Sequence, residues 1–179
     1  MRLRVVIIAL MALSCAASAQ VASMSYWVLL RDDGHTWCGY TNMAEFTSDV
    51  GKMRPKPEES AKVTYASDKL IEVTYQVEPQ SGDWVVIDRY TPAKDQLILR
   101  RTNLLTQDSL QIIEETSIRG SRVEPFHVLS TTTLDGTKAN ASGIDLPSVP
   151  IKTDLSGTPS LIVVAEIRQQ SISKLCKAF

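Results

Sequence analysis

The sequence predicts an α+β fold, in which a C-terminal helix packs on a curved antiparallel β-meander of about six to eight strands. Three observations support this prediction. Apolar and polar side chains alternate through residues 71–77, turn-forming residues then recur at regular intervals, and apolar residues adopt a helical spacing near the end of the chain. A chain of 179 residues is long enough for one domain of ordinary size.

The composition is that of an ordinary folded protein. Hydrophobic residues make up 44% and charged residues 22% of the chain, which excludes collagen-like, low-complexity and disordered classes. The 19 Lys and Arg residues nearly balance the 20 Asp and Glu residues, so the charge predicts no nucleic-acid partner. Phosphate-binding, serine-hydrolase and zinc-protease motifs are not found, so the sequence predicts no cofactor, no metal site and no catalytic residue.

The first 19 residues have the features of a secretory signal peptide. Arg2 and Arg4 precede an apolar run at residues 5–13, and Ala17 and Ala19 place small residues where a signal peptidase binds. The run is shorter than the roughly 20 residues needed to span a bilayer. We therefore expect cleavage before Gln20.

Cleavage would leave one exported domain, residues 20–179, with a net charge of −3 in place of −1 because the leader carries two arginines. No second apolar run reaches membrane length, so we expect a periplasmic or extracellular protein that is not an integral membrane protein. Lipoprotein processing at Cys15 is disfavoured, since Leu13 lies two residues before the cysteine and not three.

Export changes the interpretation of the two remaining cysteines, Cys38 and Cys176. Two cysteines in an oxidising compartment usually pair, and this bridge would join the start of the domain to its end. The weaker alternatives are two separate thiols and, because His35 precedes Cys38 by three residues, a cysteine nucleophile. The same pair supplies only half of a zinc site.

The N-terminal part of the domain predicts a hairpin and a short helical turn. Asp33-Gly34 separates two β-prone runs, and a hairpin centred there places Trp27 opposite Tyr40. Asn42 is the expected cap of a helical turn. A polar segment with two prolines, residues 51–60, predicts a linker.

The rest of the chain predicts the meander, a loop and a helix. Turn residues separate the expected strands, which are residues 62–65, 71–77, 84–90, 97–105, 110–118 and 123–134. Residues 135–158 are rich in Gly, Pro, Asp and Ser and predict a long loop. A Thr-Pro pair then opens a segment with apolar residues on one helical face, so we expect a helix over residues 159–177.

One polar cluster follows from the predicted registers. A hairpin centred on Gln107-Asp108 places Arg101 opposite Glu114, and one centred on Gly120-Ser121 places Glu114 opposite His127. A turn centred between residues 93 and 94 continues this row with Val86 and places Asp88 one step along the same face.

This face is otherwise apolar, and Trp84 lies on it with Leu99. Charged residues on such a face either form a ladder at the sheet edge or line a ligand pocket. The sequence leaves both interpretations open. The pocket interpretation comprises Asp88, Arg101, Glu114, His127 and Trp84.

These observations favour an exported, non-enzymatic module that binds a ligand or partner of the cell envelope. The alternative is a carrier of a small apolar molecule, held between the sheet and the C-terminal helix in a cavity near Trp84 and Leu99. A third hypothesis is a hydrolase that uses His127 with Glu114 or Asp88.

Overall fold

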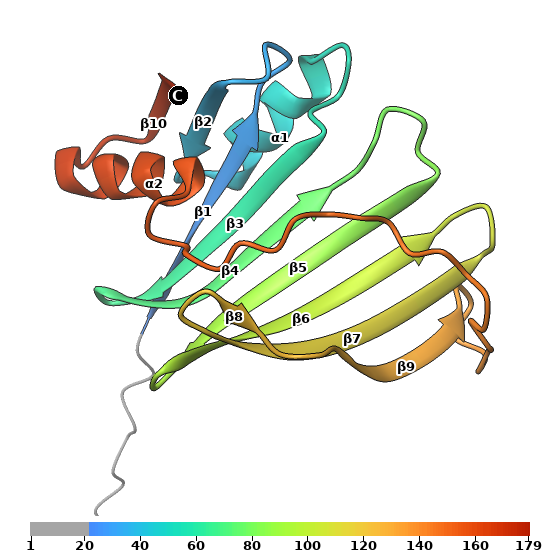
Figure 1. Cartoon of the computed structure of the whole chain (residues 1–179). Helices are drawn as coiled ribbons and strands as arrows, with labels where there is room; N and C mark the ends of the chain where they lie inside the picture. Colours follow the sequence, from blue (N-terminus) through green and yellow to red (C-terminus); the bar gives the residue numbers. More distant parts are fainter. Residues whose placement is uncertain (1–21) are drawn as a thin grey trace, which may run out of the picture.

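A curved, twisted antiparallel sheet makes up most of the chain (Figure 1). The computed structural model describes residues 22–179, so the predicted leader, with its cleavage site and Cys15, lies outside the described residues. The elements are β1 (Ser23–Leu30), β2 (Thr36–Tyr40), α1 (Met43–Lys52), β3 (Glu59–Ala66), β4 (Lys69–Val77), β5 (Trp84–Ala93), β6 (Gln96–Leu105), β7 (Leu110–Arg119), β8 (Arg122–Val123), β9 (His127–Thr133), α2 (Pro159–Gln170) and β10 (Lys174–Ala178).

The strand order confirms the predicted antiparallel meander and its C-terminal helix. From β3 to β7 each strand pairs with the next one along the chain. Beyond β3 lie β1, β2 and β10, and on the other side β7 pairs with both β8 and β9. The described strands number ten and not six to eight, because Pro125 separates β8 from β9 and a further strand forms at the end.

The predicted helix over residues 159–177 is too long. Helix α2 ends at Gln170, and Ser171 adopts a left-handed conformation with a φ of 53°. The chain then forms β10, in which Cys176 lies directly opposite Cys38 of β2. The predicted Cys38–Cys176 disulfide is present and joins these two strands. The sequence pattern places residues 174–177 in the helix. Their backbone N–H and C=O groups are instead satisfied by pairing with β2.

The first hairpin has the predicted register, with Trp27 opposite Tyr40. Its turn is stabilised by Asp33, whose carboxylate accepts hydrogen bonds from the backbone of His35 at 3.0 Å and of Thr36 at 2.7 Å. A hydrogen bond of 2.6 Å from the Thr36 hydroxyl, together with these backbone bonds, lowers the pKa of Asp33 to about 2.

Helix α1 covers the outer face of β1 and β2. Asn42 caps it, as expected, and accepts a backbone hydrogen bond at 2.8 Å, but the helix has ten residues and not one turn. The segment that joins it to β3 comprises residues 53–58, so both ends of the predicted 51–60 linker belong to regular elements. Pro55 and Pro57 lie within the shortened connection.

Helix α2 covers the opposite, inner face of β1 and β2 (Figure 1). It approaches closely at Gly39, where an added Cβ would lie 2.7 Å from Val163 Cγ1 and 2.8 Å from Ile167 Cδ1. A residue without a side chain is therefore required for this contact. The two helices enclose the strands that carry the disulfide.

The inner face of the sheet forms the main hydrophobic core. Two pairs of tyrosine rings meet edge to face in it, Tyr26 with Tyr65 and Tyr75 with Tyr90. The Tyr75 hydroxyl also lies 2.6 Å from the Ser160 hydroxyl, which links the centre of the sheet to the start of α2.

Residues 139–158, here called the strap, cross the inner face from β9 to α2 (Figure 1). The first part packs on the end of the sheet, where Ala139, Ala141 and Ile144 contact a buried cluster of leucines and isoleucine. Leu155, near the other end, is buried in the main core. The strap therefore completes the inner layer beside α2.

Candidate functional site

The predicted polar cluster contains a buried ion pair. Arg101 Nε and Nη2 each donate a hydrogen bond of 2.7 Å to a different oxygen of Asp88. The two residues are only 7% and 3% exposed. Burial lowers the pKa of Arg101, but the hydrogen bonds and negative charge of Asp88 outweigh that effect, so the pKa is raised.

The buried ion pair holds the strap against the sheet. Arg101 Nη2 also donates to the backbone oxygen of Val149 at 3.0 Å. Next to it, the Tyr90 hydroxyl accepts a hydrogen bond of 2.9 Å from the backbone nitrogen of Lys152. Burial raises the pKa of Tyr90, with the charge of Asp88 adding to the effect, so this hydroxyl keeps its proton at neutral pH. Part of the predicted ligand cluster therefore binds the protein's own backbone.

The predicted register of β5 and β6 is wrong by two residues. Asp88 lies directly opposite Arg101, whereas Val86 lies opposite Asn103. The strand continues through Pro92, and the turn lies further along the chain. This is possible because β4 pairs with β5 only as far as Tyr90, so β6 is the sole neighbour of the proline.

The prediction for His127 is also wrong. The β7–β8 hairpin has the expected register, but Pro125 shifts the chain by one residue before β9, and His127 lies opposite Glu115. Its side chain is therefore exposed on the other face from Glu114. The same shift places Phe126 on the inner face, where its ring centroid lies 5.7 Å from the guanidinium carbon of Arg101.

Glu114 lies opposite Arg101, as predicted, but it does not bind it. Instead, a carboxylate oxygen of Glu114 accepts a hydrogen bond of 3.1 Å from the side-chain amide of Asn103. Asn103 is completely buried, and its amide oxygen has no hydrogen-bond partner among the described residues. The four charged residues of the predicted cluster thus divide into a strap-binding pair, a separate carboxylate and an exposed histidine.

Trp84 borders a cavity of about 250 Å³ between the sheet and the strap. The carrier hypothesis places a cavity near Trp84 and Leu99 behind the C-terminal helix. The cavity beside Trp84 is covered by the strap and not by α2, and Leu99 is buried in the packed core. The other lining residues are Glu59, Tyr75, Val77, Val86, Asp88, Ser148, Val149, Pro150 and Lys152.

Lys152 closes one side of this cavity. Its Nζ lies 2.9 Å from Glu59 Oε1 and 4.6 Å from the ring centroid of Tyr75. Among the lining residues, the charged groups are already paired with one another or with Arg101, which leaves Trp84 and the aliphatic side chains as the free surface. The cavity fits a small apolar molecule better than an ion.

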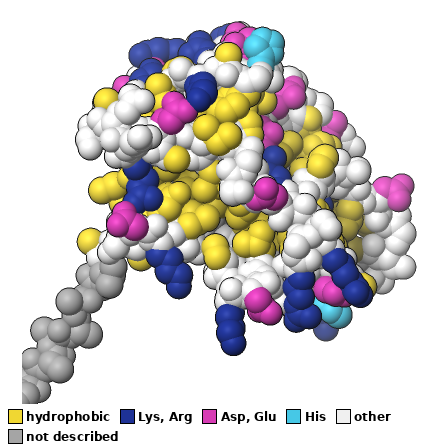
Figure 2. All heavy atoms as spheres, turned by 60° about the vertical axis from the view of Figure 1, so that its left-hand side comes forward, with side chains coloured by type: hydrophobic (Ala, Val, Ile, Leu, Met, Phe, Trp, Pro, Cys, Tyr) yellow, Lys and Arg dark blue, Asp and Glu magenta, His cyan; other side chains and the backbone are white. Residues whose placement is uncertain are grey.

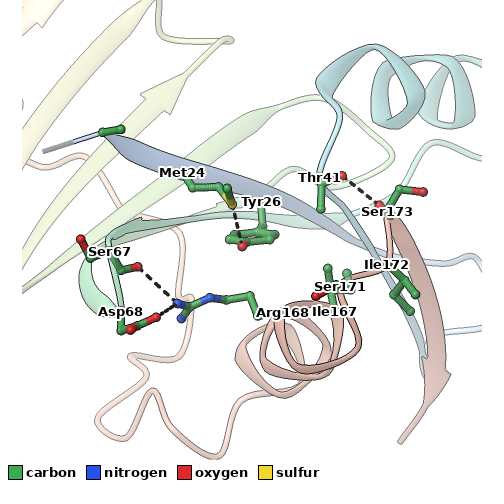
Figure 3. Close-up of a pocket in the computed structure, with 11 residues that line it drawn as sticks. Met24, Tyr26, Thr41, Ser67, Asp68, Ile167, Arg168, Ser171, Ile172 and Ser173 are labelled. Atoms are coloured by element: carbon green, nitrogen blue, oxygen red, sulfur yellow. Dashed lines mark hydrogen bonds and ion pairs between the residues drawn. The ribbon is translucent and has the colours of Figure 1, made fainter.

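A larger hollow lies between β1 and the end of α2, and its volume is about 640 Å³ (Figure 3). We call it the β1–α2 groove. Met24 and Tyr26 of β1 form its floor, and Ile167, Arg168 and Ile172 form the facing wall. The residues that close it at the two ends are Ser67 and Asp68 of the β3–β4 turn, and Thr41, Ser171 and Ser173.

Polar contacts fix both ends of the β1–α2 groove. At one end Arg168 donates to Asp68 at 2.7 Å and to the backbone oxygen of Ser67 at 3.2 Å, and its guanidinium carbon lies 4.0 Å from the centroid of Tyr65. At the other end the backbone nitrogen of Thr41 donates to the oxygen of Ser173. The floor between these ends is mostly apolar.

Figure 2 turns this side of the molecule toward the viewer and shows hydrophobic side chains gathered at its centre, with charged side chains around them. Met24 is 57% exposed, although the adjacent Tyr26 is buried. A contiguous apolar patch with charged side chains around it is typical of an interaction site.

The sequence did not identify the β1–α2 groove, because its residues come from four distant segments. The available signals were weak: an apolar Met24 at the very start of the domain and an arginine in the last turn of α2. Neither feature differs from ordinary surface chemistry until the chain is folded.

Comparisons of the chain with protein-family models, with curated proteins and with solved structures give no match. Among residues 22–179, no cluster of three metal-binding side chains occurs. No helix in the same range is long and apolar enough to cross a membrane.

Proposed function

We propose that this chain is an exported, non-enzymatic module that binds a partner protein of the cell envelope through the β1–α2 groove. The single observation that carries the proposal is the groove itself, which is open to solvent, about 640 Å³ in volume, and floored by apolar side chains. An open groove of this kind favours a macromolecular segment over an enclosed small molecule.

Two features support export. The leader has the charge, apolar run and small residues of a signal peptide. The Cys38–Cys176 disulfide is of the kind that persists in oxidising compartments such as the periplasm and the extracellular space.

The groove can be tested by cross-linking in the cells that make the protein. We would replace Met24 by a photoreactive amino acid and use Met43 as the matched control, because the two methionines are 57% and 56% exposed on different elements. We expect one other envelope protein to be cross-linked from position 24 and not from position 43. Equal labelling at both positions, or none at position 24, would contradict the proposal.

A second function, the carriage of a small apolar molecule, is favoured by the cavity beside Trp84. Its volume of about 250 Å³ is near the lower limit for ligand sites. Native mass spectrometry of the protein purified from its own cells would detect such a molecule. Val86→Trp, which fills the cavity, should abolish the added mass, and Val85→Trp on the opposite face should retain it. A protein without added mass would contradict this function.

A further inference from the structure

The two edges of β1 are not equally paired. On one edge, all residues from Ser23 to Leu29 pair with β3. On the other edge, β2 pairs only from Trp27 onward, because β2 ends at Tyr40 and the chain then leads into α1. Residues 22–26 therefore have no strand neighbour on that edge among the described residues, although β1 lies well inside the strand order.

The backbone groups that face this vacancy can be identified from the pairing of β1 with β2. The Arg31 nitrogen donates to the Thr36 oxygen across these two strands. Backbone direction alternates along a strand, so every second residue before Arg31 also faces the β2 side. Beyond the end of β2, these residues are Ser25 and Ser23. Their two N–H and two C=O groups thus point into the vacancy.

The β1–α2 groove lies beside these backbone groups, and the vacancy is bounded at one end by Thr41 and Ser173 (Figure 3). Five residues of extended chain, 22–26, cover about 17 Å. The last turn of α2 extends over this stretch with Ile167, and Ile172, which follows the helix, lines the groove near Ser173. The vacancy therefore has the length of a short strand and an apolar wall on one side.

We propose that the partner supplies an extended segment that adds to β1 as a strand, antiparallel to β1 and in line with β2. This inference rests on the proposed function of the β1–α2 groove and names its occupant. Regularly spaced N–H and C=O groups at a sheet edge are satisfied by another strand, which presents the complementary groups at the same spacing.

The side chains around the vacancy indicate the sequence of the segment. Residues opposite Met24 and Tyr26 would face the groove, where Ile167 and Ile172 favour uncharged apolar side chains. Residues opposite Ser25 would face the outer side, beside the Ser25–Thr64 hydroxyl contact of 3.2 Å, where polar side chains fit. Arg168 and Asp68 form an ion pair with each other, so this end of the groove carries no net charge from the two residues. We therefore expect about five residues of alternating apolar and polar character.

A tethered strand tests this mode of binding without knowledge of the partner. The sequence Val-Thr-Val-Thr-Val-Thr-Asn-Gly, here called the threonine extension, would replace Gln20, so that the leader (residues 1–19) still directs export and the Asn-Gly turn directs the added strand back along β1. A control would carry proline at the two positions opposite Ser23 and Ser25, which removes the N–H groups that donate to them. Amide hydrogen exchange of Ser23 and Ser25 is measured in both proteins and in the protein that begins at residue 20.

We expect exchange at Ser23 and Ser25 to be slower by about tenfold or more with the threonine extension than with the proline extension. In cells, the threonine extension should also abolish the cross-link from position 24, and the proline extension should not. Equal exchange with both extensions, or a cross-link that survives the tethered strand, would overturn strand addition.

The outcomes separate this inference from the proposed function. If position 24 gives a cross-link that the tethered strand does not block, the groove binds a partner but not as a strand. If the tethered strand slows exchange of the Ser23 and Ser25 amides but no cross-link forms from position 24 of the natural chain, the proposed function fails and the inference fails with it. A cross-link from position 24 to a second copy of this chain would overturn the inference that a different protein supplies the strand.

Discussion

Asp88 and Arg101 face each other directly across β5 and β6 and are joined by two hydrogen bonds of 2.7 Å. The same guanidinium group binds the backbone oxygen of Val149 in the strap. Two charges are thus buried where the sheet meets a segment without regular structure. A buried arginine with three satisfied contacts fixes the position of that segment more strictly than an apolar contact does.

Loss of Arg101 should destabilise the protein far more than loss of its neighbour. Arg101→Met leaves the buried Asp88 without its charged partner and with only a hydrogen bond of 3.5 Å from the Tyr90 hydroxyl, and should lower the free energy of unfolding by about 3–5 kcal/mol. Arg100→Met removes an ion pair with Glu115 whose arginine is half exposed, and should cost less than about 1 kcal/mol. Urea unfolding measures both values, and similar losses would contradict the role of Arg101.

The strap should detach when this ion pair is broken. Limited proteolysis of Arg101→Met is expected to cleave between residues 139 and 158, whereas Arg100→Met should resist cleavage there. The double variant with Asp88→Leu removes the unpaired charge and should recover about 2 kcal/mol of the lost stability. If the double variant recovers stability but its strap is still cleaved, the cost of burying the unpaired charge and the binding of the strap are separate effects.

Gly39 should tolerate no side chain, because α2 crosses it. In Gly39→Ala the new Cβ would lie within 3 Å of Val163 and Ile167, and we expect a loss of about 1–3 kcal/mol in the free energy of unfolding. Gly51→Ala is the control, since nothing lies within 4 Å of a Cβ there and the position is helical. That change should be neutral or stabilising.

Removal of the disulfide should release the end of the sheet. The bridge closes a sequence separation of 138 residues, for which chain entropy gives about 4–5 kcal/mol as an upper figure. Thermal unfolding of a variant with Cys38→Ser and Cys176→Ser should occur at a lower temperature than that of the oxidised protein. A reductant should lower the unfolding temperature of the natural protein and leave the double variant unchanged.

Acidification should weaken the contact between α1 and β10. Hydrogen bonds from Lys174 at 2.5 Å and Tyr40 at 3.0 Å lower the pKa of Asp49 below its ordinary value of 3.8. A lowered pKa in the folded state adds stability above pH 3.8, and that stability is lost as the pH falls toward the folded value. Unfolding measured between pH 7 and pH 2.5 should show a smaller loss for Asp49→Asn than for the natural protein.

The meander was predictable because local patterns determine its hairpins. The hairpin centres near residues 33, 107 and 120 all give the observed pairing next to the turn. The prediction failed at two prolines, because a proline can either lie within an edge segment of a strand or end a strand. Pro92 is part of a strand, because its neighbour β4 has ended, whereas Pro125 interrupts one and shifts the register.

The sites were less predictable, because they depend on contacts between distant segments. Arg101 and Glu114 are opposed as predicted, yet Arg101 binds Asp88, since that residue lies directly opposite on the other neighbouring strand. The carrier hypothesis placed a cavity between the sheet and the C-terminal helix, near Trp84 and Leu99, whereas the cavity beside Trp84 lies under the strap and is not lined by Leu99, because a loop sequence does not indicate which face it will cross. The open edge of β1 arises from where β2 ends, a boundary that hydrophobic pattern alone does not define.

The strand order also has a consequence for the path of folding. Strands β3 to β7 pair with their neighbours in sequence, so each hairpin can form with little loss of loop entropy. Strand β10 must instead return to β2 across most of the chain, so we expect it to pair there after these hairpins have formed. Pulse-labelled amide exchange during refolding should therefore show protection in β5 to β7 first and in β10 last.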